Sequence, residues 1–226
     1  MCGIAATYAY HHVVTPVDRD EVRKIRDRMT ARGPDAAGEW FSDDWRVAMG
    51  HRRLSIIDLS ERASQPMLNQ NGDIALVYNG EIYNYRELRD RLVRSGYRFR
   101  SESDTEVLLA LYAEKGEKML GDLRGMFAFA LWDAKKEILF LARDPYGIKP
   151  LYYADDGRTL RVSSQVKALL ASQNVSRIKE PAGIVGFFLY GTVPEPYTLY
   201  REVRAVTAGS FLRVDERGSS QPTQYF

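Results

Sequence analysis

The sequence predicts a layered α+β fold with mostly antiparallel sheets and with helices on the outside. Runs with strand character are interrupted by runs with helical periodicity, and the two do not alternate regularly, which argues against a doubly wound parallel sheet. The segment 126–133 is apolar at nearly every position, as expected for a strand covered on both faces. The 226 residues, 45% of them hydrophobic, suffice for a sizeable core without disulfides.

The helices are indicated by apolar residues at helical spacing and by residues that favour helix ends. Asp18 is a suitable N-cap for the first helix, and Gly96 is expected to stop the second. Ser103 and Glu106 fit a capping box at the start of the third. We expect helices over residues 18–29, 84–94, 104–114, 165–172 and 181–189.

The strands are indicated by short apolar or β-branched runs between turn residues. The pair Asn79-Gly80 readily takes positive φ, so we expect the strand before it to end there. The apolar segment 187–190 and the neighbouring residues 194–197 are expected to pack in the core rather than to cover a partner. We expect strands over residues 4–10, 39–41, 46–51, 74–78, 126–133, 138–143, 150–154, 159–162 and 210–214.

Composition excludes several classes of partner and location. The formal net charge is +2 and no basic block is present, so we expect no nucleic-acid partner. The apolar runs 126–132 and 183–190 are too short to span a membrane, and the N-terminus lacks the features of a signal peptide. A single cysteine excludes an internal disulfide and a zinc site built mainly from thiolates. We therefore predict a cytoplasmic protein.

The one cysteine is Cys2, directly after the initiator methionine. Because methionine is removed before a small residue, we expect Cys2 to carry both a thiol and a free α-amino group. Their reference pKa values are about 8.5 and about 7.7–8.0, so the amine is partly neutral near pH 7 and can take the thiol proton. An N-terminal amine is a recognised activator of such a nucleophile. Taken alone, Cys2 also fits a small buried apolar residue.

Three further groups have the chemistry of a binding site, each with an ordinary structural alternative. Asn79 and Gly80 offer a side-chain amide and an unhindered N–H, the two donors of an oxyanion hole, or they form a simple turn. An arginine of the pair Arg52-Arg53 can bind a carboxylate with two hydrogen bonds, or both are solvated. Asp104 can face an ammonium group, or it belongs to the helix cap.

Together these segments resemble the glutaminase domain of asparagine synthetase, a class II glutamine amidotransferase of the N-terminal-nucleophile hydrolase group. The resemblance implies a four-layer αββα sandwich, which agrees with the mixed, antiparallel order. The matching stretches occur in the family's order and span most of the chain. They are MCGI (1–4), RGPD (32–35), HRRLSIID (51–58), QPM (65–67), YNGEIYNY (78–85), SDTE (103–106), GMFAFALWD (125–133) and RDPYGIKPLYY (143–153).

The resemblance also implies the role of each residue. Cys2 attacks the side-chain amide of glutamine, with its own α-amino group as the base, and Asn79 and Gly80 hold the oxyanion. In the substrate-binding part, Arg53 binds the α-carboxylate of glutamine. The α-ammonium group is received by Glu81 and Asp104. No residue is implied to bind a metal.

The resemblance assigns residues 2–215 to the amidotransferase domain and 216–226 to a polar tail or the start of a linker to an absent synthetase domain. The sequence has no phosphate loop of the P-loop type, so ATP and Mg²⁺ are expected only in a separate or missing synthetase domain or chain. That domain or chain is the expected ammonia acceptor. Gln165 stands where the family usually has Glu. Two alternatives stay open: a non-catalytic glutamine-binding or interaction module, and an N-terminal fragment of a full asparagine synthetase. A metal site formed by His11, His12 and His51 is less expected than solvent-exposed histidines.

Overall fold

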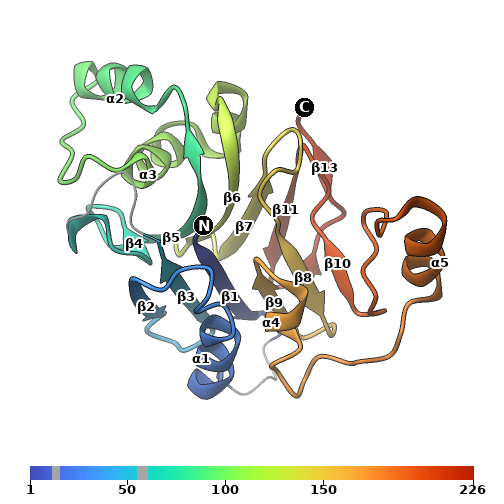
Figure 1. Cartoon of the computed structure of the whole chain (residues 1–226). Coiled ribbons are helices and arrows are strands. Elements are labelled where there is room, and N and C mark those ends of the chain that lie inside the picture. The colour runs from blue at the N-terminus through green and yellow to red at the C-terminus, as the bar shows by residue number, and fades with distance from the viewer. Residues whose placement is uncertain (12–15, 55–60) are drawn as a thin grey trace.

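The computed structural model describes residues 1–11, 16–54 and 61–226, and two antiparallel sheets pack face to face in it with helices on both outer sides (Figure 1). The first sheet has the strand order β10-β8-β9-β1-β3-β2. Its strands are β1 (Gly3–Ala9), β2 (Ala36–Phe41), β3 (Val47–Arg53), β8 (Tyr152–Asp155), β9 (Thr159–Ser163) and β10 (Val203–Ala205).

The second sheet has the order β12-β11-β7-β6-β5-β4, and β13 pairs with β11 outside this path. Every strand pair recorded in both sheets is antiparallel. The strands are β4 (Met67–Leu68), β5 (Ile74–Ile82), β6 (Gly125–Asp133), β7 (Ile138–Arg143), β11 (Ser210–Asp215), β12 (Gly218–Ser219) and β13 (Thr223–Gln224).

Helices α1 and α4 lie on the outer side of the first sheet and α2 and α3 on that of the second, whereas α5 stands apart beyond β10 (Figure 1). Helices α2 and α3 contribute leucines to a core shared with the second sheet, and α1 contributes Ile25 to a small core under the first. The four layers of the predicted αββα sandwich are therefore confirmed. The helices are α1 (Arg19–Asp27), α2 (Tyr85–Arg94), α3 (Asp104–Lys115), α4 (Val166–Leu169) and α5 (Pro181–Tyr190), with 3₁₀ segments at Glu61–Ala63 and Gly116–Asp122.

The central core lies between the sheets, and the strand alternation decides which residues enter it. In β5, Ala75 and Val77 face the first sheet, whereas Leu76 and Tyr78 pack against the core shared with α3. Successive side chains of a strand point to opposite faces, so this register determines on which side each later residue of β5 projects. The residues that follow, Asn79 to Glu81, form one wall of the cavity described below.

The strand β5 does not end at Asn79-Gly80, so the prediction of a turn there is wrong. The strand continues to Ile82, with Asn79 opposite Ala128 and Gly80 opposite Phe127. A Cβ on Gly80 would lie 2.4 Å from the Met126 carbonyl oxygen. The glycine is needed because the neighbouring strand passes too close for a side chain, and not because the chain turns.

The observed helix boundaries differ slightly from the predicted ones, and the apolar segment 187–190 lies on the surface rather than in the core. The helix expected over 165–172 is only α4, whereas 181–189 is confirmed as α5. In α5, Gly183 and Gly186 face residues 194–198, which leaves Phe188 and Tyr190 outside with 82% and 71% of their surface exposed. The expectation that this apolar segment packs in the core is therefore wrong.

The segment 216–226 returns along the second sheet. Its strands β12 and β13 both pair with β11, and the Tyr225 hydroxyl donates to the Arg143 carbonyl at 2.8 Å. The domain boundary at residue 215 and a linker role for 216–226 remain predictions. In the part of the chain that the structure describes, no helix is long and apolar enough to cross a membrane.

Candidate active site

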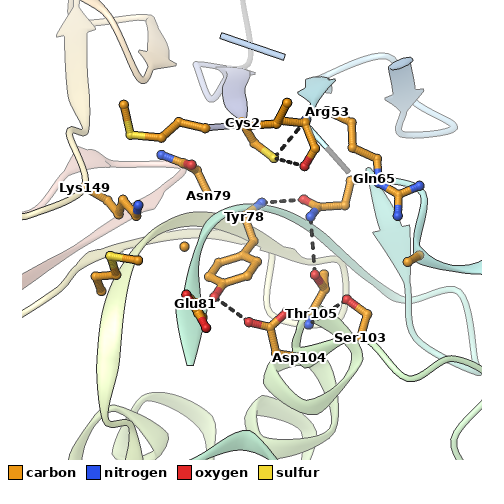
Figure 2. A pocket seen from close by; sticks show the side chains of 15 residues that line it. Cys2, Arg53, Gln65, Tyr78, Asn79, Glu81, Ser103, Asp104, Thr105 and Lys149 are labelled. Carbon is orange, nitrogen blue, oxygen red and sulfur yellow. Dashed lines mark hydrogen bonds between the residues drawn. The ribbon is translucent and has the colours of Figure 1, made fainter. Parts of the chain in front are cut away.

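A cavity of about 110 Å³ opens between the start of β1, the end of β5 and the start of α3. All six residues predicted for the site line this cavity, although they come from four separate parts of the sequence. Figure 2 shows Cys2 above the cavity, with Glu81 and Asp104 on the other side of it. The six are Cys2, Arg53, Asn79, Gly80, Glu81 and Asp104.

Cys2 is held at the cavity by contacts to both its sulfur and its backbone. The Leu54 N–H donates to Cys2 Sγ at 3.4 Å, and the Sγ lies 3.7 Å from the Leu54 carbonyl oxygen. Arg32 Nε donates to the Cys2 carbonyl oxygen at 3.0 Å. These contacts fix the position of the sulfur at the edge of the cavity.

Asn79 is 2% exposed, and its amide nitrogen Nδ2 has no hydrogen-bond partner among the described residues. A buried donor without a partner costs free energy, and a ligand that accepts its hydrogen bond would remove this cost. This donor belongs to a residue on the cavity wall, next to Gly80 in the same strand. The pair therefore has donor groups at a place where a negative oxygen would be stabilised.

Asp104 lies at the first position of α3 and is 3% exposed. Its Oδ2 accepts a hydrogen bond from the Tyr78 hydroxyl at 2.7 Å and another from the Ile82 N–H at 3.1 Å. Burial raises the pKa of Asp104 above its ordinary value of 3.8, while these hydrogen bonds act in the opposite direction. A cation in the cavity would further favour the ionised carboxylate.

The start of α3 confirms the predicted N-cap but not the full capping box. Ser103 Oγ accepts from the Thr105 N–H at 3.2 Å. The Glu106 carboxylate, however, does not return to Ser103. It accepts hydrogen bonds from the N–H groups of Arg100 and Ser101 and from the Ser101 hydroxyl. Glu106 therefore anchors the preceding loop, which no local pattern could reveal.

The neighbouring arginines Arg52 and Arg53 have different surroundings. Arg52 Nη2 pairs with Asp27 Oδ1 at 2.7 Å on the side of α1. Arg53, the next residue along β3, lines the cavity instead. Alternation along the strand separates them, and the alternative in which both are solvated is not what the structure shows.

The family described as glutamine amidotransferase domain matches residues 1–226 of this chain. This chain belongs to that family. It is 40% identical to asparagine synthetase [glutamine-hydrolyzing] 1 of Bacillus subtilis, over 100% of this chain and 35% of that protein. It is 41% identical to amidase chry2 of Gibberella zeae, over 76% of this chain and 26% of that protein. The amidotransferase domain thus spans about a third or less of these curated relatives.

A solved structure supports the fold independently of sequence. Glutamine phosphoribosylpyrophosphate amidotransferase from B. subtilis, complexed with ADP and GMP, matches with a TM-score of 0.73. The identity is 21%, and the match covers 100% of this chain and 49% of that one. The amidotransferase domain is homologous to the glutaminase part of asparagine synthetases, as predicted.

Gln65 and Lys149 are among the residues that line the cavity of the amidotransferase domain but were not predicted as part of the site, although both lie in the family-like stretches. Gln65 joins two walls, because its Oε1 accepts from the Tyr78 N–H at 2.6 Å and its Nε2 donates to Thr105 Oγ1 at 3.3 Å. Lys149 lines the cavity opposite β3 and is 7% exposed. Its place in the stretch 143–153 was the available signal, but sequence alone did not indicate where its ammonium group points.

Of the two histidines that the structure describes, His11 is exposed as expected, but His51 is not. His51 is 1% exposed rather than solvated, and its Nε2 donates to the Tyr78 carbonyl oxygen at 3.3 Å. Burial lowers the pKa of His51 from 6.5 to about 3. His12 lies outside the described residues, as do residues 55–58 of one family-like stretch. Within residues 1–11, 16–54 and 61–226, no group of three or more His, Cys, Asp or Glu side chains could hold a metal ion.

Proposed function

We propose that this domain hydrolyses glutamine to glutamate and ammonia through a thioester on Cys2, and that the ammonia serves an asparagine-synthetase-like amidation. One observation carries the proposal. A thiol, two potential oxyanion donors, one guanidinium group and two carboxylates meet in a single cavity of about 110 Å³. This set matches the chemical features of glutamine, which is a zwitterion at one end and a neutral amide at the other.

The zwitterionic end accounts for the charged residues of one wall. Arg53 would bind the α-carboxylate with its planar pair of N–H donors. Asp104 and Glu81 would receive the α-ammonium group. Because Asp104 is a buried carboxylate, a bound ammonium group would compensate the cost of its negative charge.

The reaction then proceeds at the other end. Met1 is 55% exposed, and we infer that it is removed, which leaves an α-amino group on Cys2. This amine takes the thiol proton, and the sulfur attacks the γ-carbonyl carbon. Asn79 Nδ2 and the Gly80 N–H hold the resulting oxyanion; the loss of one such donor typically costs about 3 kcal/mol. The protonated α-amino group of Cys2 then gives the proton to the amide nitrogen, which leaves as ammonia. Water hydrolyses the remaining thioester to glutamate.

The use of the ammonia is assigned to a partner. The chain spans 35% of the B. subtilis asparagine synthetase that it matches. We propose that ATP and Mg²⁺ are bound, and the acceptor carboxylate chosen, in a synthetase domain or chain that works with this one. A cytoplasmic location fits such a metabolic role.

The decisive experiment measures glutamate release from glutamine by protein whose N-terminus has been shown by mass spectrometry to be Cys2. Two matched variants serve as controls. Cys2→Ala removes the sulfur, whereas insertion of one alanine between Met1 and Cys2 keeps the sulfur but moves the amine to another residue. Both should lose turnover by about 100-fold or more.

Glutamate release that does not exceed the Cys2→Ala background would reject the hydrolytic function. If glutamine nevertheless bound to that protein in calorimetry, a non-catalytic glutamine-binding module would be the correct description. Normal turnover by the alanine-insertion variant would instead retain glutamine hydrolysis but reject the α-amino group as the base.

A further inference from the structure

Lys149 is a buried cation in the cavity that the proposed reaction does not use. It is 7% exposed and lines the same cavity as Cys2 and Asn79. Among the residues that the structure describes, its ammonium group has no hydrogen bond or ion pair, whereas its backbone N–H and carbonyl are both hydrogen-bonded. A lysine with so little exposed surface is normally paired with an acidic group. An unpaired ammonium group on a cavity wall therefore points to an anionic ligand.

The loop before Lys149 is built to hold this residue in one position. The fully buried Asp144 accepts hydrogen bonds from the Ile148 and Lys149 N–H groups, both at 2.9 Å. Arg143 donates from Nε to the Lys149 carbonyl oxygen at 2.8 Å and from Nη2 to the Gly147 carbonyl oxygen at 2.8 Å. These hydrogen bonds fix the backbone from which the Lys149 side chain projects, so the direction in which it enters the cavity is set before a ligand binds.

Lys149 lies apart from the residues proposed to bind the zwitterionic head of glutamine, that is, its α-carboxylate and α-ammonium groups. Figure 2 shows Lys149 on the opposite side of Asn79 from Arg53, with its ammonium group directed toward the interior of the cavity. The other charged side chains on the wall are Arg53, Glu81 and Asp104, and the zwitterionic head accounts for all three. Lys149 therefore faces the end of the cavity where the side-chain amide would react.

We propose that Lys149 stabilises the negative charge that arises at the reacting end: first the oxyanion, and then the γ-carboxylate of the product glutamate. This inference rests on the proposed hydrolysis of glutamine. The γ-amide of the substrate is neutral, so a cation beside it contributes little to substrate binding. The oxyanion and the γ-carboxylate each carry a full negative charge, so the same cation favours both.

The test compares Lys149→Met, which keeps the length of the side chain but removes the charge, with Lys149→Arg and with the exposed-residue control Lys118→Met. In Met-free protein, Lys149→Met should lower kcat about tenfold and change the KM for glutamine by less than about twofold. Lys149→Arg should recover most of kcat, because it keeps the charge, and Lys118→Met should behave as wild type.

A binding measurement gives a readout independent of turnover. In a Cys2→Ala background, Lys149→Met should weaken glutamate binding about tenfold and leave glutamine binding within about twofold. A kcat and a glutamate affinity that both stay within twofold of wild type would overturn the proposal. Equal weakening of glutamine and glutamate would also overturn it, because Lys149 would then act on the head group or on the fold.

The experiments also distinguish failure of the proposed function from failure of the role of Lys149, and misfolding of a variant from loss of its charge. If wild-type protein releases no glutamate, the proposed function fails, and the glutamate–glutamine comparison still decides whether Lys149 binds an anion. If Lys149→Met lacks a cooperative thermal transition, Lys149→Gln is measured in the same assays, with the same outcomes supporting or overturning the role of the charge.

Discussion

The Tyr78 hydroxyl donates a 2.7 Å hydrogen bond to Asp104 Oδ2 and so joins the strand β5 to the start of helix α3. Tyr78 directly precedes Asn79, and Asp104 is the carboxylate proposed to bind the α-ammonium group of glutamine. This hydrogen bond thus fixes the position of Asp104 relative to the strand that carries Asn79. Burial and the nearby carboxylates raise the pKa of Tyr78 well above 10.0, so the hydroxyl stays a donor at neutral pH.

Replacement of Tyr78 by Phe should affect both stability and substrate binding. The buried Asp104 carboxylate would lose one donor, which is expected to lower the free energy of unfolding by about 1–3 kcal/mol and to raise the KM for glutamine severalfold. Tyr112→Phe is the matched control. The Tyr112 hydroxyl donates a 3.1 Å hydrogen bond to Asp133 Oδ2, and neither residue lines the cavity. A similar rise in KM for the control variant would contradict this explanation.

Replacement of Asn79 by Ala should lower turnover with little effect on stability. Because Asn79 Nδ2 has no partner to lose, Asn79→Ala is expected to change the free energy of unfolding by less than about 1 kcal/mol while kcat falls about 100-fold or more. Asn69→Ala provides the comparison, since the Asn69 side chain bonds to Asp73 and Ile74 and should matter for stability alone. Urea unfolding and glutamate release, measured on both variants, separate the two effects. Loss of stability without loss of kcat in Asn79→Ala would speak against an oxyanion role.

A methyl group at position 80 should disturb the contact between two strands. In Gly80→Ala the new Cβ would meet the Met126 carbonyl oxygen at 2.4 Å and the Phe127 Cα at 2.8 Å. We expect a loss of about 1–3 kcal/mol of stability together with most of the turnover. Gly121→Ala is a suitable control, because no atom lies within 4 Å of its Cβ and its backbone is not in the left-handed region, so its effect should stay within about 0.5 kcal/mol. A fully active, stable Gly80→Ala protein would show that the strands can separate without harm.

Burial of His51 predicts a specific acid sensitivity. Its pKa falls from 6.5 to about 3 in the folded protein, so between these values the unfolded chain binds a proton that the folded chain does not. Above pH 6.5 His51 is neutral in both states and does not make the free energy of unfolding depend on pH. As the pH falls from 6.5 toward 3, proton binding favours the unfolded chain, and the free energy of unfolding decreases by up to about 1.4 kcal/mol per pH unit. Chemical unfolding of wild-type and His51→Gln protein at several pH values measures this slope. An identical slope in both proteins would show that His51 titrates normally.

Local sequence signals determined the elements of this fold and many of their ends. Asp18 caps α1 as expected, with its side chain accepting the Asp20 N–H at 2.8 Å, and Ser103 caps α3. Such caps and apolar periodicities depend on residues only a few positions apart, which is why they can be recognised in a sequence. The family-like stretches likewise predicted which six residues would be brought together, while the roles of those residues remain proposals.

Only the tertiary structure decided how these residues are surrounded. That Asn79-Gly80 lies within a strand depends on Met126 of the neighbouring strand, and that His51 is buried depends on the packing of the two sheets. The place of Lys149 on the cavity wall and the unpaired amide of Asn79 were equally hidden in the sequence. The physical reason is that burial and hydrogen-bond pairing are set by segments distant along the chain, which meet only after the sheets have packed.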